Sequence, residues 1–337
     1  MNHLTRLVAL CFVATTVCAA DDLPRYQLPV GRVLHYSAQG SSKENNGAPG
    51  SRSRSTWQLT VVDNNSDGSA RVIARSGMTY TPAGANADMP ERVSTAAFDL
   101  YPDGRYRIDP QQAIRLSPQS IFPRLPGDAN QAKTQWQDDV DWTGSRTTYA
   151  PQAADKPTAE FAFTAVQDGP TNRIYITTHK STFHFDRARG VVTKVDGEFS
   201  QDWGFHQKGT SEMKLDKEET IPADQAADLA RDYATFRDAA TRYNKTMEGL
   251  HDEPARGQEI IDAAKAILTS AADKVQHQDV KREFADKLQQ HDQYAKYSLE
   301  EAKRFADVLN KPAADWSAKD LDGKPLAARD LRGKVVV

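Results

Sequence analysis

Cysteine is almost absent from this chain. The 337 residues include two cysteines, Cys11 and Cys18, and both precede Asp21. The residues before Asp21 have the pattern of a cleaved leader, so the mature chain is expected to hold no thiol. That absence excludes a disulfide bond, a thiolate nucleophile and a cysteine-ligated metal in the mature chain.

The leader begins with basic Arg6, continues with the apolar run 7–14 and ends in small residues up to Ala20. This order is typical of a secretory signal peptide, with cleavage expected after Ala20. The protein is therefore predicted to be exported, to the periplasm or the cell envelope. A lipid anchor would use Cys18, but Val17 is not the small residue usual before such a cysteine, so soluble export is favoured.

Long apolar runs and blocks of one charge are also missing. No later segment approaches the roughly 20 apolar residues of a membrane-spanning helix. The 43 basic and 46 acidic residues leave a net charge of −3, and no nucleic-acid partner is expected. The chain has no Gly-rich phosphate loop, Gly-x-Ser-x-Gly elbow or His-Glu-x-x-His motif. The sequence therefore assigns no catalytic, cofactor-binding or metal-ligating residue, and no cofactor.

The region 21–221 contains short β-branched and aromatic runs separated by turn signals such as 64–68 and 102–104. Closely spaced strands with tight turns predict a mainly antiparallel, strongly curved sheet or an open barrel. Residues 40–55, rich in Ser, Asn and Gly, are expected to form a mobile loop, and a helical turn is expected near 117–122. The expected strands are 33–36, 56–62, 70–74, 97–101, 161–163, 173–177, 182–185, 191–195 and 212–215.

The periodicity changes at Pro222. Apolar residues then recur every three or four positions, which predicts amphipathic helices at 229–250, 260–271 and 280–309. Pro254 separates the first two, and Pro312 ends the third. The predicted class is multidomain α+β: a leader, 1–20, a β domain, 21–221, a helical connector, 222–310, and a C-terminal segment, 311–337.

Residues 63–68, Asp-Asn-Asn-Ser-Asp-Gly, match the front half of a calcium-binding loop. The position at which such a loop needs a bidentate glutamate is Ala74, and the flanking residues are expected strands. A polar hairpin turn is therefore favoured over a metal site.

His179 and His184 lie in one predicted strand region, five positions apart. A regular strand would point their side chains to opposite faces, so they cannot share a metal. His206 could join one of them across the sheet, but ordinary surface or edge histidines are favoured.

Asp138, Asp139 and Asp141 lie between Trp136 and Trp142. Paired carboxylates can act as acid and base when unequal environments separate their pKa values. Strand alternation would place Asp139 and Asp141 together on one face, so a half-buried strand with solvated acids is favoured.

Aromatic residues of the expected strands could line an apolar cavity inside a curved sheet. Strand aromatics more often form the core, which is the favoured interpretation, and no ligand class follows from them. They are Tyr36, Trp57, Phe98, Tyr101, Phe161, Phe163, Tyr175, Phe183 and Phe185.

The C-terminal segment reads Pro-Ala-Ala-Asp-Trp at 312–316, Leu-Asp-Gly-Lys-Pro-Leu at 321–326 and Asp-Leu-Arg-Gly-Lys-Val-Val-Val at 330–337. It resembles the start of thioredoxin-like domains of the TlpA and ResA type, within the wider peroxiredoxin-like superfamily. The resemblance implies a β-hairpin and then the first central strand. In that family the strand leads to a Cys-x-x-Cys turn at a helix N-terminus, where the thiol pKa is lowered.

The resemblance covers fewer than 30 residues and stops before the family's cysteines, so none of its catalytic residues is carried over. We expect a truncated chain, inactive by itself, from an exported thiol-disulfide oxidoreductase that acts on protein thiols or disulfides. The alternative is a complete, non-catalytic envelope binding or scaffold protein whose β domain binds an unidentified partner or an apolar ligand. A third option is peroxidase chemistry at a single cysteine.

Overall fold

The computed structural model describes residues 23–44, 47–108, 118–138, 146–152, 160–168, 176–202, 206–308, 315–319 and 322–331. The expected leader, with Cys11 and Cys18, lies outside the described residues. The chain divides after Ile221 into two compact units. We call them the β unit, up to Ile221, and the C-terminal unit, from Pro222 onward.

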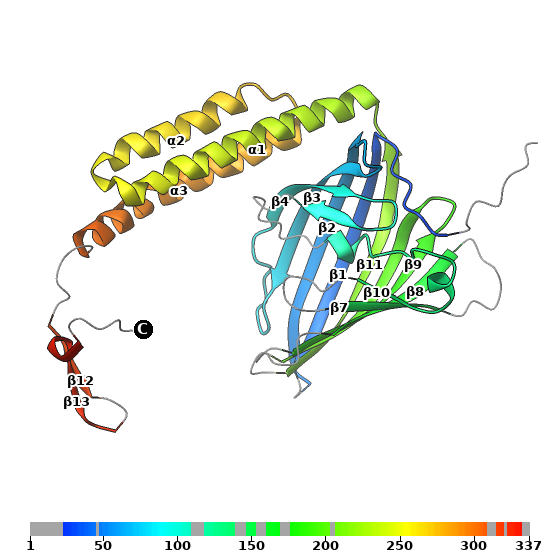
Figure 1. Cartoon of the computed structure of the whole chain (residues 1–337), viewed down its shortest axis with the longest axis horizontal. Coiled ribbons are helices and arrows are strands. Elements are labelled where there is room, and N and C mark those ends of the chain that lie inside the picture. The colour runs from blue at the N-terminus through cyan, green and yellow to red at the C-terminus, as the bar shows by residue number, and fades with distance from the viewer. Residues whose placement is uncertain are drawn as a thin grey trace, which may run out of the picture. The chain divides into compact units, whose positions relative to one another are not determined.

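In the described part of the β unit, eleven strands form one antiparallel sheet in the order β5-β4-β3-β2-β1-β11-β10-β9-β8-β7-β6 (Figure 1). The sheet is curved but unclosed, since β5 and β6 are its two edges. The predicted α+β class with a curved antiparallel sheet is confirmed. The strands are β1 (Arg32–Glu44), β2 (Pro49–Asn64), β3 (Ala70–Thr81), β4 (Arg92–Leu100), β5 (Tyr106–Ile108), β6 (Trp136–Gln137), β7 (Arg146–Pro151), β8 (Glu160–Asp168), β9 (Ile176–Asp186), β10 (Val191–Asp202) and β11 (His206–Thr220).

The first and last strands of the β unit meet at the centre of the sheet. β1 and β11 pair antiparallel from Arg32↔Thr220 to Glu44↔Gln207. All other neighbours in the sheet are consecutive in the sequence and form hairpins. The pairing of β1 with β11 therefore joins two series of hairpins into one sheet.

One face of this sheet, which we call the inner face, carries the hydrophobic core. Side chains of alternate residues on β1 and β2, such as Leu34 and Leu59, point to this face and are 1% exposed. Residues 118–125, which include the short helix η1 (Pro118–Ser120), cover it with the fully buried Ile121 and Leu125. Burial of each such side chain contributes about 1.5–3 kcal/mol. The predicted turn near 117–122 is confirmed.

The prediction of a mobile loop at 40–55 is wrong. β1 continues to Glu44, and β2 already begins at Pro49. Gly40, for example, pairs with Ser53 on one side and with Ser211 on the other. Small polar residues have a weak intrinsic preference for strands. They form strands here because both neighbouring strands supply backbone hydrogen-bond partners.

Two further expectations about strands need correction. The strands expected at 173–177 and 182–185 belong to one strand, β9, although 173–175 lie outside the described residues. The strands β5 and β7 were not among those expected, because each is short. The half-buried strand expected at 136–142 is described only as β6, since 139–142 lie outside the described residues. β7 is held by its register with β8, from Arg146↔Asp168 to Pro151↔Phe163.

The three predicted helices are confirmed as α1 (Ala223–Asp252), α2 (Gly257–Ala272) and α3 (Gln278–Val308), with the short η3 (Pro254–Arg256) after α1. They pack on one another through a core that includes Leu250, Ile261 and Ala302. The buried Asp232 accepts hydrogen bonds from the backbone N–H groups of Gln276 and His277, at 2.6 and 2.7 Å. Among the described residues, no helix is both long and apolar enough to cross a membrane.

The predicted C-terminal hairpin is present. β12 (Ser317–Lys319) pairs antiparallel with β13 (Pro325–Ala327), and η4 (Ala328–Leu331) follows. Gly323 in the turn has φ of 79°, a left-handed conformation that glycine adopts at little cost. The terminal strand expected at 334–337 lies outside the described residues.

Candidate functional site

The inner face of the β unit is built from cross-strand rows that differ in side-chain size. We call the end of the sheet at which β1 begins its base. In the first row, nearest to this base, Tyr36 pairs with Trp57 and Leu215. The next row mixes small and large residues: Ser55, Ala38, Met213, Val195, Phe183 and Phe163. The third row, which we call the small-residue row, consists of Ser53, Gly40, Ser211, Gly197, Ser181 and Ala165.

An aromatic wall stands on the β6–β9 side of these rows. Trp136 stacks on Tyr149 with ring centroids 5.5 Å apart, and Phe163 stacks on Phe183 at 5.2 Å. Tyr149 also meets Phe163 edge to face, at 6.1 Å. Offset and edge-to-face contacts of this kind stabilise aromatic pairs by about 0.5–1.5 kcal/mol beyond burial, so the wall is a rigid surface.

A hollow of about 730 Å³ lies on the inner face, between the small-residue row and the aromatic wall. We call it the cleft. Trp57, Tyr149, Phe183 and Met213 line it, and η1 borders it with Pro118. The hollow exists because serine, glycine and alanine side chains do not fill the space that large residues fill in the two rows nearer the base. Its volume is in the range of small-molecule sites.

His179 supplies an ionisable group in the cleft. It lies half-buried on the inner face of β9, where its ring stacks on that of Phe199 at 5.9 Å. Burial lowers the pKa of His179, so the imidazole is neutral at neutral pH. A neutral imidazole can both donate and accept a hydrogen bond, without bringing a charge into an apolar site.

Two large apolar side chains remain exposed on the same face. Met78 and Tyr80 on β3 are 44% and 38% exposed. Their cross-strand partners are Ser55 and Ser53, so they extend the second and third rows onto β3. Apolar side chains therefore continue from the cleft to the surface.

The predicted core aromatics are largely confirmed. Tyr36, Phe98, Phe161, Phe163, Phe183 and Phe185 are buried in the core of the β unit. Phe183 and the half-buried Trp57 also line the cleft. For these two residues, the less favoured prediction of a cavity lined by aromatic side chains agrees with the structure. Tyr101 instead joins a polar network, and Tyr175 lies outside the described residues.

The two histidines of β9 point to opposite faces, as predicted. His184 lies on the outer face, with Nδ1 2.6 Å from Glu160 and Nε2 3.6 Å from Asp196, whereas His179 faces the cleft. The side chain of His206 lies outside what the structure describes. Within the described residues, no group of three or more His, Cys, Asp or Glu side chains could hold a metal ion.

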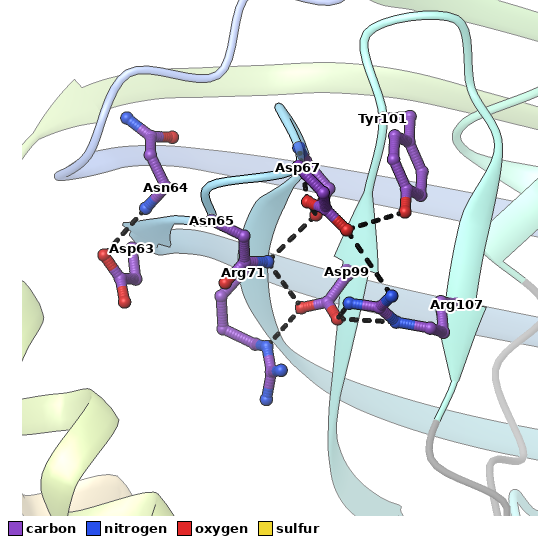
Figure 2. A network of polar contacts seen from close by, with 9 residues as sticks. Asp63, Asn64, Asn65, Asp67, Arg71, Asp99, Tyr101 and Arg107 are labelled. Atoms are coloured by element: carbon purple, nitrogen blue, oxygen red, sulfur yellow. Dashed lines mark hydrogen bonds and ion pairs between the residues drawn. The ribbon is translucent and has the colours of Figure 1, made fainter.

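Residues 63–68 close the β2–β3 hairpin, which confirms the predicted turn. Asp67 accepts hydrogen bonds from the backbone N–H and the hydroxyl of Ser69. It also accepts one from the Tyr101 hydroxyl (Figure 2). These bonds, first those from Ser69 and then that from Tyr101, lower the pKa of Asp67 to about 2. The carboxylate therefore organises the turn.

Next to this turn, the buried carboxylate of Asp99 is held by two arginines and an amide (Figure 2). Arg71 Nε lies 2.5 Å and Arg107 Nη2 2.8 Å from its oxygens, and Asn65 donates at 3.0 Å. Burial opposes ionisation of Asp99, but these bonds outweigh it and hold its pKa below the usual value. The network ties β3, β4, β5 and the β2–β3 turn together.

The acids at 138–141 do not form a described pair. Asp138 is half-buried, and it accepts a hydrogen bond of 2.6 Å from the hydroxyl of Tyr149. Burial first, and then the charge of Asp138, raise the pKa of Tyr149. Asp139 and Asp141 lie outside the described residues. Asp138 thus orients one residue of the aromatic wall.

The small-residue row is the part of the cleft that sequence reasoning missed. One available signal was the alternation Ser51-Arg52-Ser53-Arg54-Ser55, which has the period of a strand with unlike faces. The composition of 40–55 directed attention to a loop instead. Even a correct strand assignment would not have aligned Ser53 with Ser211, because that alignment depends on long-range register.

No known protein-family model matches this chain, and no curated protein sequence matches it. Solved structures with similarity include the S-type phycobiliprotein lyase of Guillardia theta, with a TM-score of 0.24 and 10% identity over 56% of this chain and 88% of that one. A protein described as a lipoprotein from Parabacteroides distasonis has a TM-score of 0.22 and 10% identity, covering 58% and 97%. A protein described as AttH from Nitrosomonas europaea has 0.17 and 11%, covering 54% and 92%. Similarities this weak support no inference.

Proposed function

We propose that the β unit is a binding module that takes up an apolar small molecule in the cleft. The observation that carries this proposal is the hollow of about 730 Å³ between the small-residue row and the aromatic wall. Its lining combines apolar and aromatic side chains with polar ones, and small-molecule sites use the first for contact and the second to fix the ligand's orientation. His179 and the serine hydroxyls would orient a polar group of the ligand, and Trp57, Phe183 and Met213 would contact its apolar part.

The cleft can be tested by filling it. Ser211 is exposed on the inner face of β11, so a tryptophan there would occupy the hollow without displacing the core. We expect Ser211→Trp to weaken binding of the apolar fluorophore N-phenylnaphthylamine by about tenfold or more, equal to the loss of about 1.4 kcal/mol of binding energy. The measurement is a fluorescence titration of the purified protein, with circular dichroism to verify folding.

A matched control lies three residues further along the same strand. Lys214 is exposed on the outer face of β11, so Lys214→Trp adds the same side chain outside the cleft. This variant should bind the fluorophore like the wild type. Equal affinities of both variants, or no binding to the wild type, would contradict the proposal.

A second candidate function is the thiol-disulfide oxidoreductase expected from the C-terminal segment. The hairpin β12–β13, with its glycine turn at Gly323, is the observation that favours it. In this proposal the segment is the start of a thioredoxin-like domain, and exported protein thiols or disulfides are its partners. The β unit would then bring a bound partner to that domain.

This second candidate is tested on the natural gene. Its coding sequence should continue past Val337 into an aromatic residue and Cys-x-x-Cys, and the complete protein should catalyse reduction of insulin by dithiothreitol. A single cysteine instead of the pair would indicate peroxidase chemistry. A stop codon directly after Val337 would remove the oxidoreductase proposal and leave the binding module.

A further inference from the structure

Two lysines oppose each other directly on the outer face of the β unit, near the β1–β2 turn. Lys43 on β1 is the cross-strand partner of Lys208 on β11. Both are exposed, and neither has an ion pair within the residues that the structure describes. Like charges directly opposite on neighbouring strands destabilise a sheet. The pair therefore has a cost that nothing in the described fold offsets.

In a second lysine pair on the same face, acidic neighbours offset the repulsion between the two charges. Lys194 on β10 opposes Lys214 on β11. The Nζ of Lys194 lies 2.9 Å from Asp196, and that of Lys214 lies 3.6 Å from Asp216. Here acidic neighbours compensate both charges. The uncompensated pair at Lys43 and Lys208 is thus distinct from its counterpart on the same sheet.

The uncompensated lysines border a hollow of about 630 Å³ that adds a third cation and several hydroxyls. Lys180 lines it as well, and Glu198 is the one acidic residue among its described lining. An adjoining hollow shares Lys180 and Glu198 and holds Arg52, but Asp88, Asp196 and Glu212 also line it, so acidic residues balance its cations. Lys180 lies opposite Glu198 across β9 and β10, and it has no ion pair among the described residues. The hydroxyls that face the first hollow belong to Ser41, Ser200 and Thr210.

We propose that Lys43, Lys180 and Lys208, which we call the cation cluster, bind a phosphate group. After Glu198 is subtracted, these three cations leave a surplus of positive charge that suits a doubly charged oxyanion better than a single carboxylate. Several phosphate oxygens can accept hydrogen bonds from ammonium and hydroxyl donors at once. The phosphate belongs either to an anionic lipid headgroup or to a soluble phosphate ester. The site is on the opposite face from the cleft and does not depend on the function proposed for it.

The test compares two double variants that remove the same charge from the same face. K43Q/K208Q removes the uncompensated pair, and K194Q/K214Q removes the compensated one. Inorganic phosphate should raise the thermal unfolding midpoint of the wild type and of K194Q/K214Q. K43Q/K208Q should need about tenfold or more phosphate for the same shift, since two charge-assisted hydrogen bonds to the phosphate are lost. Without phosphate, K43Q/K208Q should unfold at a higher temperature than the wild type, because the opposed charges are gone.

A second arm of the test identifies the source of the phosphate. The wild type is floated with vesicles of phosphatidylcholine alone and with vesicles that also contain phosphatidylglycerol. Flotation only with phosphatidylglycerol, lost in K43Q/K208Q and kept in K194Q/K214Q, assigns the site to a lipid headgroup. A response to inorganic phosphate without flotation assigns it to a soluble ester. The proposal is overturned if the wild type responds in neither arm, or if both double variants lose the response equally.

Discussion

At the scale of single residues, the most constrained group of the β unit is the carboxylate of Asp99. Its side chain is 4% exposed, yet it stays ionised because Arg71, Arg107 and Asn65 donate to it. A buried charge is tolerated when hydrogen bonds replace its lost hydration. The network therefore holds β5, a three-residue edge strand, on β4.

Replacing Asp99 with asparagine should destabilise the protein by about 2 kcal/mol, because charge-assisted hydrogen bonds from two arginines become neutral ones. Urea denaturation followed by tryptophan fluorescence measures this loss. The control is Asp63→Asn, at an exposed residue near the end of β2, where the loss of stability should stay within about 0.5 kcal/mol. Equal losses for the two variants would show that the network does not stabilise the fold.

The same carboxylate gives a pH dependence with a defined sign. Because the pKa of Asp99 is lower in the folded state, the unfolded state binds a proton more readily. The stabilisation is therefore complete above the unfolded pKa, about 3.9, and is lost as the pH falls through the folded value. The stability difference between the wild type and Asp99→Asn should accordingly shrink below about pH 4.

At the scale of elements, the strands of the β unit depend on a few close backbone contacts. Gly31, directly before β1, has φ of 88°, and its N–H donates to the carbonyl of Val61 at 2.8 Å. Its own carbonyl accepts from the N–H of Ile221 at 2.8 Å, directly after β11. One residue thus connects the ends of the three central strands β1, β2 and β11.

Gly31→Ala should destabilise the β unit by more than the cost of the left-handed backbone alone. A Cβ at this position would lie 2.2 Å from the backbone oxygen of Ile221, whereas a Cβ at Gly68, with φ of 82°, would meet nothing within 4 Å. Gly68→Ala therefore serves as the control, with an expected loss of about 1–2 kcal/mol. Thermal unfolding of both variants measures the difference, and equal midpoints would refute the clash.

At the scale of the whole molecule, the chain consists of two units with separate cores. The helices α1 to α3 contain no tryptophan, whereas Trp57 and Trp136 lie in the β unit. Fluorescence therefore follows mainly the β unit, and helical circular dichroism follows the helices. Two units with separate hydrophobic cores need not unfold together, so the two signals can report different transitions.

We expect the helical transition to move to lower temperature between about pH 7.5 and pH 5.5. Buried His291 lies 3.2 Å from the Tyr243 hydroxyl, and burial lowers the pKa of His291. The unfolded state then takes up the proton more readily, so stability is complete above the unfolded pKa and falls as the pH falls through the folded one. His291→Gln, which does not titrate, should remove most of the shift. Coincident transitions at both pH values would contradict the two-unit description.

Local sequence determined the elements whose signal lies within one segment. The helices follow from a period that repeats over ten or more residues, and the C-terminal hairpin follows from Asp322-Gly323 between two short runs. Phe183 and Trp57 were recognisable as candidates for an inner face because strand alternation is also local. In each of these cases, the interactions that decide the structure are between residues near in sequence.

The tertiary structure alone decided where the cleft lies. Its small-residue row depends on Gly40 pairing with both Ser53 and Ser211, and the latter is 171 positions away in the sequence. A shift of one residue in that register would turn every side chain of β1 to the other face. The same long-range pairing places Lys43 opposite Lys208. Neither the cleft nor the cation cluster can be derived from segments taken one at a time, because each is made by strands that meet only after the chain has folded.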